Sequence, residues 1–291
     1  MTGEFTETGN RRGNRSPAPK AAHPFIKWAG GKGQLLEQFE VLFPPKFKGY
    51  HEPFLGGGAV FFHLAGQLTR RRRFLMDLNP ELINAYLVVR DNVELLIEDL
   101  KTHQATQEYY YKTRAVDPKD LSPVSRASRL IYLNRTCFNG LYRVNRKGQF
   151  NVPYGRYKNP TICDGENLRA CSKILRKSSI RVADFSEVLE HAESGDFVYM
   201  DPPYYPLTNT AYFTDYTVHG FGDDEQKRLS DVYRDLDKRG CQVMLSNSDV
   251  PRVRDLYSGF KVITVRANRQ INSKASLRGP VSEVVITNYE V

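Results

Sequence analysis

The most informative residues in this chain follow a short apolar run, in the stretch FVYMDPPY at residues 197–204. The apolar run predicts a strand, and the prolines end it because they lack an N–H and favour extended backbone before them. A strand end followed by a turn explains Pro202 and Pro203 but requires neither Asp201 nor Tyr204. The Asp201 carboxylate and the Pro202 carbonyl are two hydrogen-bond acceptors that can receive both N–H bonds of one amine.

This pair of acceptors suits an amine whose lone pair is delocalised into a ring, such as N6 of adenine. That nitrogen is a poor nucleophile toward an electrophilic methyl group, and two aimed acceptors favour the pyramidal form that develops as the lone pair localises. Tyr204 can stack on the base and hold it against the methyl donor. We therefore predict Asp201, Pro202, Pro203 and Tyr204 to form a catalytic loop, with no metal and no covalent intermediate.

A glycine-rich turn, EPFLGGGAV at residues 52–60, is the second candidate site. Glycines between a strand and a helix let a cofactor approach the backbone, although Phe61 stands where the dinucleotide-binding pattern needs its third glycine. Asp77 ends the next predicted strand, where a carboxylate usually accepts the hydroxyls of a cofactor ribose. The alternatives are a purely structural turn and a role for Asp77 at the start of the following helix.

Two further features point to a cofactor. Asp184 closes the next core strand and can hold an adenine edge, with helix capping ahead of Ser186 as an equal alternative. The stretch KWAGGK, residues 27–32, contains the only tryptophan of the chain, whose ring can stack on a ligand or simply pack. It does not match a phosphate-binding loop, because Ile26 and Gly33 replace required residues, so we expect no ATP or GTP binding.

Short apolar runs alternate with helical patterns along the chain, which indicates an α/β fold with a mostly parallel sheet covered by helices. The predicted strands are residues 49–54, 73–77, 180–183, 197–200, 242–246, 261–266 and 283–288. The predicted helices are residues 58–65, 80–100, 186–192, 223–238 and 250–257. Asn79 and Pro80 are typical of a helix start.

Residues 93–170 interrupt this alternation. After a helix predicted over residues 124–134, the stretch is dense in Arg, Lys, Asn, Tyr and Gly, and residues 141–144 and 149–152 flank a turn-forming Asn145-Arg146-Lys147-Gly148. We expect an insertion with a β-hairpin. Residues 23–92 and 171–291 would form the catalytic domain, and residues 1–22 a disordered tail.

The amino-acid composition indicates which kinds of partner and compartment to expect. The 291 residues carry a formal net charge of +9, which favours a polyanion and nucleic acid first. Four cysteines without a Cys-x-x-Cys pair and six histidines without ligand-like spacing predict a reduced, cytoplasmic protein without a metal site. No apolar stretch is long enough to cross a membrane. The four arginines at 70–73 are expected to be a solvated turn.

Five motifs together resemble the Dam-type DNA adenine-N6 methyltransferases of the D12 class, alpha group. They occur in the family's order and cover nearly everything after residue 24: KWAGGK at 27–32, PFLGGG at 53–58, NR and FNGL at 134–141, FNVPYG at 150–155, and DPPY at 201–204. The resemblance implies a Rossmann-like, seven-stranded S-adenosylmethionine methyltransferase sheet. It also implies an inserted helical target-recognition domain, residues 93–170, bearing the β-hairpin.

The same resemblance implies site residues by motif match. The cofactor S-adenosylmethionine would contact Trp28, Lys32, Phe54, Gly56, Gly58, Asp77, Asp184 and Asp201. The DNA would contact Lys27, Arg135, Phe138, Asn139, Leu141, Arg143 and Pro153, with residues 141–152 in the major groove.

Chemistry suggests a role for several of these DNA contacts. Arg143 suits a guanine edge, and Leu141 and Pro153 suit a thymine methyl group. Phe138, at a position that is often Tyr, can fill the stack left by a flipped adenine. The alternative is that many of the basic residues contact phosphates without specifying sequence.

The resemblance therefore implies methyl transfer to adenine N6 in double-stranded DNA, with GATC as the favoured target because Leu141, Arg143 and Pro153 fit that subgroup. Tyr142, between two of the readers, departs from the common pattern. The alternatives are another conjugated amine (RNA adenine, cytosine N4 or a protein amide) and an inactive DNA-binding homologue. A prokaryotic or phage-encoded enzyme, with a cognate restriction endonuclease as a further partner, is expected.

Overall fold

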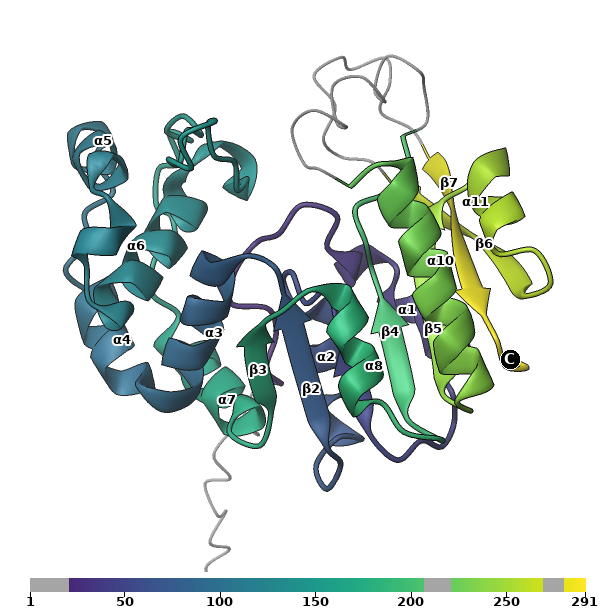
Figure 1. Cartoon of the computed structure of the whole chain (residues 1–291). Helices are drawn as coiled ribbons and strands as arrows, with labels where there is room; N and C mark the ends of the chain where they lie inside the picture. The colour runs from purple at the N-terminus through teal and green to yellow at the C-terminus, as the bar shows by residue number, and fades with distance from the viewer. Residues whose placement is uncertain (1–20, 207–220, 269–279) are drawn as a thin grey trace, which may run out of the picture.

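A seven-stranded sheet forms the centre of the computed structural model, which describes residues 21–206, 221–268 and 280–291 (Figure 1). The strand order is β3-β2-β1-β4-β5-β7-β6. The strands are β1 (Tyr50–Glu52), β2 (Arg73–Asp77), β3 (Ser179–Val182), β4 (Phe197–Met200), β5 (Gln242–Ser248), β6 (Lys261–Asn268) and β7 (Pro280–Thr287). All seven predicted strands therefore form, with small shifts at their ends. The predicted tail lies outside the described residues, apart from Ala21 and Ala22.

The sheet is mixed. The pairs from β3 through β5 are parallel, whereas β7 runs antiparallel between β5 and β6. The expected α/β class and mostly parallel sheet are thus confirmed, with an antiparallel segment at the C-terminal end of the chain.

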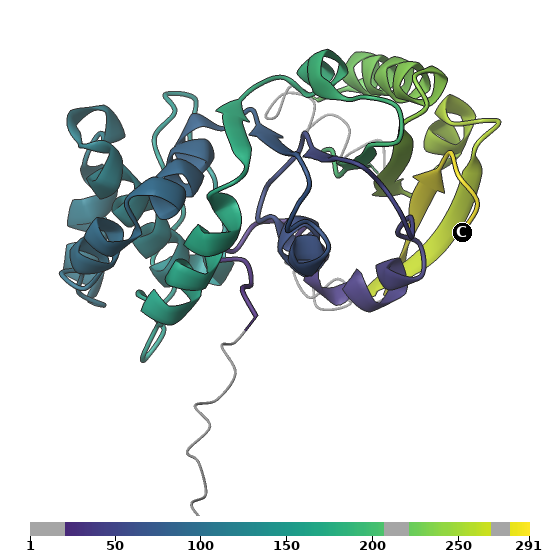
Figure 2. The same ribbon diagram turned by 90° about the horizontal axis from the view of Figure 1, so that it is seen from below.

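Both faces of the sheet are covered, as the alternation along β4 shows. Phe197 and Tyr199 join one hydrophobic cluster and Val198 and Met200 join the other, because successive side chains of a strand point to opposite faces. The first cluster includes side chains of α1 (Leu36–Glu40), α2 (Ala59–His63) and α3 (Pro80–Asp91). The second includes side chains of α8 (Val188–His191), α10 (Asp223–Lys238) and α11 (Pro251–Leu256), and Figure 2 shows the two layers.

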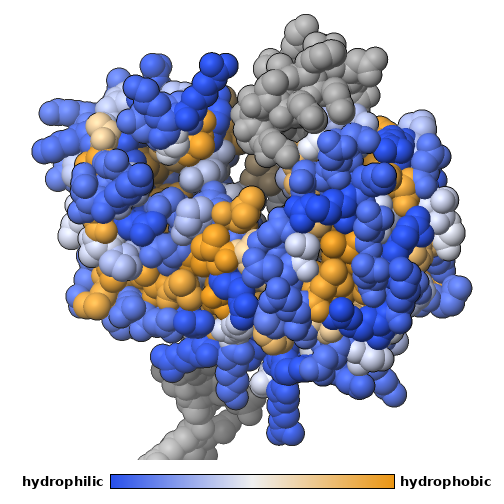
Figure 3. Space-filling view, in the orientation of Figure 1, coloured by the Kyte–Doolittle hydropathy of each residue, from blue (hydrophilic) through white to orange (hydrophobic). Residues whose placement is uncertain are grey.

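Further helices lie between β2 and β3 in the sequence and stand beside the sheet in both ribbon views. They are α4 (Val93–Leu100), α5 (Gln107–Ala115), α6 (Pro123–Thr136) and α7 (Gly165–Leu175). Tyr110, Tyr132 and Phe150 belong to a small separate core in this region. Figure 3 shows one face of the molecule as mainly hydrophilic, with apolar patches across its middle.

The helix predicted over residues 80–100 is wrong in one respect, because it breaks at Asn92. This residue has φ −134° and ψ 37°, so the chain changes direction between α3 and α4. Asparagine has a low helix propensity because its side chain competes for backbone hydrogen bonds. The break lets Leu96, Ile97 and Leu100 of α4 become buried at its contacts with α6 and α7.

The predicted β-hairpin is also less regular than expected. Residues 141–144 and 149–152 form no paired strands, and Val144 and Phe150 make only an isolated antiparallel bridge. Asn145 N–H donates to the Gln149 carbonyl at 2.8 Å, and Asn145 Oδ1 accepts from the Lys147 and Gln149 backbone. The turn is therefore held chiefly by the Asn145 side chain, which competes with a regular ladder.

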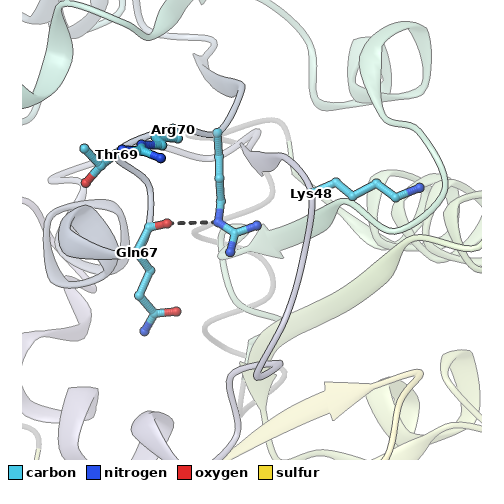
Figure 4. Close-up of a pocket in the computed structure, with 5 residues that line it drawn as sticks. Lys48, Gln67, Thr69 and Arg70 are labelled. Atoms are coloured by element: carbon cyan, nitrogen blue, oxygen red, sulfur yellow. Dashed lines mark hydrogen bonds between the residues drawn. The ribbon is translucent and has the colours of Figure 1, made fainter.

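The four-arginine run differs from the predicted solvated turn. Arg73 is buried in β2 and donates to the Ile174 carbonyl, and Arg72 pairs with Glu193. Arg70 and Arg71 line a basic hollow with Lys48 at the amino ends of the strands (Figure 4). Its other lining residues are Gln67, whose carbonyl accepts from Arg71 Nε at 2.9 Å, and Thr69.

No helix among the residues described is long and apolar enough to cross a membrane.

The cap of α3 gives a test of this architecture. Asn79 Oδ1 accepts from the backbone N–H groups of Glu81 and Leu82, whereas Asn92 precedes α4 without any side-chain cap bond. We expect Asn79→Ala to lower the free energy of unfolding by about 1 kcal/mol and Asn92→Ala to change it far less. Urea denaturation followed by circular dichroism measures both, and equal losses would contradict the capping assignment.

Candidate active site

The candidate site lies where the carboxyl ends of β1, β2 and β4 meet at one edge of the sheet. Because these neighbouring strands are parallel, the segments that follow them emerge side by side. The glycine turn follows β1, Asp77 ends β2, and Asp201 follows β4. The structure thus brings together predicted site residues that are more than 100 positions apart in the sequence.

Asp201 makes a close ion pair with Lys32. The Lys32 Nζ lies 2.7 Å from Asp201 Oδ1 and donates to the Gly30 carbonyl at 2.6 Å. Lys32 is only 5% exposed, so its charge is held against the carboxylate rather than in water. The pair joins the KWAGGK segment to the end of β4.

Several carboxyl groups crowd this edge of the sheet. Burial raises the pKa of Asp201, while the charge of Lys32 acts in the opposite direction. Burial also raises the pKa of Glu52, which accepts from the Tyr50 hydroxyl at 2.7 Å, and of Asp77. No group of three or more His, Cys, Asp or Glu side chains in the described part of the chain could hold a metal ion.

Tyr204 is fixed at both ends. Its hydroxyl donates to Glu283 Oε2 of β7 at 2.8 Å, and Lys32 Nζ lies 4.7 Å from its ring centroid in a cation–π contact. Burial and the neighbouring Asp201 and Glu283 raise the pKa of Tyr204 well above its usual value. The phenol therefore stays protonated and keeps its hydrogen bond.

The backbone of the Asp-Pro-Pro-Tyr loop is held by residues that sequence reasoning missed. Gln226 Nε2 donates to the Pro203 carbonyl at 2.8 Å. The Tyr205 N–H donates to Asn247 Oδ1 at 3.0 Å, and Ser248 Oγ donates to the Tyr205 carbonyl at 2.6 Å. The signal that could have found them is the polar run Ser246-Asn247-Ser248, which continues the apolar pattern of a central strand.

The glycine turn is shaped by close contacts. Gly56 and Gly58 have φ of +47° and +67°, the left-handed region that favours glycine. A Cβ at Gly58 would lie 2.7 Å from the Tyr86 hydroxyl, and one at Gly56 2.9 Å from Trp28 Cδ1. The turn therefore admits no side chain at either position.

Asp77 anchors this turn. Its Oδ2 accepts from the Gly56 N–H at 2.9 Å, and its Oδ1 accepts from the Asn79 N–H at 2.9 Å, just ahead of α3. Asp77 therefore does have the structural role at the start of the following helix that was the alternative to a cofactor contact. Each oxygen of a carboxylate accepts more than one hydrogen bond, so these contacts are compatible with an additional ribose contact.

Aromatic rings surround the turn. Trp28 stacks on Tyr142 with ring centroids 5.1 Å apart, and Phe54 stacks on Phe185 at 5.3 Å. The Phe221 ring meets Phe54 edge-on at 5.8 Å. The aromatic partners of Trp28 and Phe54 come from distant segments, and no local pattern in the sequence identified them. Tyr142 lies against a predicted cofactor residue, although it stands between two predicted DNA contacts.

Asp184 makes the helix-capping contacts that were predicted as the alternative to a cofactor contact. It caps a short helical turn, Phe185–Glu187, by accepting from Ser186, and the Glu187 side chain accepts from the Asp184 N–H in return. Arg228 binds both oxygens of Asp184, at 2.7 and 2.8 Å, and holds the pKa of this carboxyl well below its usual value. A cofactor contact at Asp184 stays a prediction.

Three of the predicted DNA contacts, Lys27, Phe138 and Pro153, are held by hydrogen bonds between distant segments, and Lys27 is bound by one buried amide. Asn134 accepts from the Lys27 N–H at 2.9 Å and donates to the carbonyls of Lys27 and Gly140 at 2.8 and 2.9 Å. Phe138 is 51% exposed, and its N–H donates to the Pro153 carbonyl. Segments around residues 27, 140 and 153 are thereby brought together.

The remaining predicted DNA contacts have different surroundings. Asn139 has φ +56°, and its N–H donates to the Tyr157 hydroxyl. Leu141 packs against the small core of the helical region. Arg143 is exposed, and its Nε donates to Asn151 Oδ1 at 2.7 Å, which fixes the direction of its guanidinium. Arg135 is less available, because it is half-buried and donates to the Phe25 carbonyl.

Comparisons with known proteins match most of the chain. The family model for "D12 class N6 adenine-specific DNA methyltransferase" matches residues 28–271. The "Type II methyltransferase M1.LlaDCHI" of Lactococcus lactis subsp. cremoris is 47% identical over 274 residues, covering 91% of this chain and 95% of the relative. The "Type II methyltransferase M.MjaIII" of Methanocaldococcus jannaschii is 45% identical over 285 residues, covering 91% and 99%. The "DNA adenine methylase" of Escherichia coli (strain K12) is 34% identical over 270 residues, covering 91% and 95%.

The family match spans most of the chain and includes both the glycine turn and the Asp-Pro-Pro-Tyr loop. The relatives are covered almost over their full length. Adenine N6 is one of the conjugated amines that the two acceptors at residues 201 and 202 were predicted to suit. The chain belongs to the D12 class N6 adenine-specific DNA methyltransferases.

Proposed function

We propose that Asp201 and Pro202 bind the reacting amine of a flipped adenine in duplex DNA while the methyl group is transferred. The observation that carries this proposal is the placement of Asp201, partly buried at the carboxyl end of a central strand and paired with Lys32 at 2.7 Å. Lys32 contacts Oδ1, and the amine would donate to Oδ2 and to the Pro202 carbonyl. The hydrogen bonds to these two acceptors strengthen as the nitrogen becomes pyramidal and its N–H groups become more acidic. They therefore stabilise the transition state more than the ground state.

The residues around the glycine turn fit S-adenosylmethionine as the methyl donor. When bound, this cofactor supplies an electrophilic methyl group on a positively charged sulfur. The carboxyl groups of Asp77 and Asp201 supply negative charge and acceptors at the same edge, and Gly56 and Gly58 leave the backbone uncovered. Trp28, Lys32 and Phe54 would contact other parts of the cofactor, and Asp184 its adenine edge.

The target base would be held by Tyr204. Its ring is fixed by Glu283 at the hydroxyl and by Lys32 at the face, so it can offer a rigid stacking surface. Flipping is required because N6 is inaccessible in the stacked duplex. The exposed Phe138 ring would fill the vacated stack.

Residues 93–170 would form the target-recognition domain, beside a catalytic domain of residues 23–92 and 171–291. Lys27, Arg135, Phe138, Asn139, Leu141, Arg143 and Pro153 would contact the DNA. We propose GATC as the target, because Arg143 suits a guanine edge, and Leu141 and Pro153 suit a thymine methyl group. The relatives named as Type II methyltransferases support a cognate restriction endonuclease as a partner in the same cell.

The role of Asp201 is tested by Asp201→Asn, which keeps the size of the side chain and removes its charge. We expect transfer of labelled methyl to DNA to fall by about 100-fold or more, because one preorganised electrostatic contact is lost. Asp235→Asn, which removes an exposed carboxylate paired with Lys238, is the matched control and should keep full activity. Unchanged transfer by Asp201→Asn would overturn the mechanism.

The Lys32 ion pair predicts a pH effect. Lys32 lowers the pKa of Asp201 against the effect of burial, so Lys32→Met should raise that pKa further. A carboxyl with a higher pKa is protonated at higher pH, and the acidic limb of the kcat profile should move to higher pH. Lys32→Arg keeps the charge and serves as control. The comparison is made at saturating cofactor, and coinciding acidic limbs for Met and Arg variants would contradict the prediction.

Target choice is tested by expressing the enzyme in a methylation-free host and sequencing the DNA with modification resolved. We expect modified adenine in GATC, and Arg143→Gln should weaken discrimination at the guanine by about 1–3 kcal/mol. Arg146→Gln, an exposed arginine in the adjacent turn, is the control and should keep the specificity. Modification of adenine in another sequence would overturn the GATC assignment.

A further inference from the structure

Two buried amide side chains lie behind the Asp-Pro-Pro-Tyr loop without reaching the proposed position of the reacting atoms. Gln226 of α10 is 1% exposed, and Asn247 of β5 is fully buried. Buried amides are costly unless their donors and acceptors are used. Asn247 Nδ2 donates to Gln226 Oε1 at 3.0 Å, so the two side chains satisfy each other.

The direction of every hydrogen bond in this pair is determined. Asn247 Oδ1 faces two backbone N–H groups, those of Tyr205 at 3.0 Å and Ser248 at 2.8 Å, and must therefore be the acceptor. Its Nδ2 then points to Gln226 Oε1, which leaves Gln226 Nε2 to donate to the Pro203 carbonyl at 2.8 Å. Turning either amide over would set donors against donors and acceptors against acceptors.

This chain of bonds controls the geometry of the Pro202 carbonyl. The Pro203 carbonyl is occupied by Gln226 and is held toward α10. Since the ring of Pro203 locks its φ, ψ is the one backbone torsion left between its carbonyl and the peptide plane of residues 202 and 203, so a held carbonyl restricts the movement of that plane. That plane carries the Pro202 carbonyl, the second proposed acceptor for the amine.

Asn247 and its neighbour Ser248 hold the backbone on the other side of Tyr204. Asn247 and Ser248 bind the backbone N–H and carbonyl of Tyr205. The backbone of Tyr204 therefore lies between two anchored neighbours, while its hydroxyl is bound by Glu283. Stacking and amine binding consequently depend on one buried network.

We infer that Gln226 and Asn247 are positioning residues for methyl transfer, which act through the backbone of Pro203 and Tyr205 on the Pro202 carbonyl and the Tyr204 ring. The inference rests on the proposed function of Asp201 and Pro202. It predicts that the pair governs kcat rather than cofactor or DNA affinity, because both amides are buried and bond to each other and to the loop backbone.

Gln226→Glu tests the inference with almost no change in volume. An ionised carboxylate cannot donate to the Pro203 carbonyl, so kcat should fall by about 10- to 100-fold, with KM for S-adenosylmethionine and for DNA nearly unchanged. Burial favours the neutral carboxylic acid, which can donate through its O–H while its carbonyl accepts from Asn247. The ratio of variant to wild-type kcat should therefore rise as the pH is lowered from about 8.5 to about 6.

Two further variants complete the design. Gln226→Met has no hydrogen-bond donor in any protonation state, so it should show the same loss of kcat without recovery at low pH. This variant tests the inference even if Gln226→Glu does not fold. Ser230→Ala lies one turn along α10 and removes a buried hydroxyl that bonds only to the Lys227 carbonyl, so it should behave as wild type at each pH. Single-turnover rates normalised to bound cofactor exclude a loss caused by unfolded enzyme.

Wild-type kcat in Gln226→Met would overturn the inference, as would a loss in Gln226→Glu that is equal at every pH. Failure of the proposed function gives a different result, because Asp201→Asn would then methylate DNA like wild type. If only the positioning role fails, Asp201→Asn remains inactive while Gln226→Met is active.

Discussion

The ion pair between Lys32 and Asp201 joins the start of the described chain to the centre of the sheet. It lies where a low-dielectric interior makes the attraction strong and an unpaired charge costly. Lys32 can reach Asp201 only because β4 lies between β1 and β5 and ends at the same edge as β1. The same ammonium group contacts the ring of Tyr204, so one cation lies against two side chains of the Asp-Pro-Pro-Tyr loop.

The sequence predicted most of the fold because the signals were local. Apolar runs specified the strands, and Asn79 with Pro80 specified the start of α3. Two predictions of local structure were less accurate: Asn92 breaks a continuous helical pattern, and Asn145 holds a turn without paired strands. The antiparallel placement of β7 depends on pairing between distant segments, which no local pattern encodes.

The candidate site also contains residues that local sequence patterns identified and residues that they did not. Asp77, Asp201 and Tyr204 were identified because their residue types follow strand ends, and the structure places them at one edge. Gln226 and Glu283 were missed, since a polar residue in an amphipathic helix or in a strand next to the edge of the sheet has no distinctive local pattern. Their contacts with the loop join segments more than 20 and nearly 80 residues apart, so only tertiary structure identifies them.

The buried amide of Asn134 has a mechanical consequence. It bonds the backbone of Lys27 and of Gly140 at the same time, and a Cβ on Gly140 would collide with the Lys27 side chain at 2.5 Å. Lys27 is only five residues before Lys32. Asn134 therefore ties the segment around Gly140, which we propose to face the DNA, to the stretch that ends at Lys32, the partner of Asp201. Only five residues of backbone separate the two attachment points.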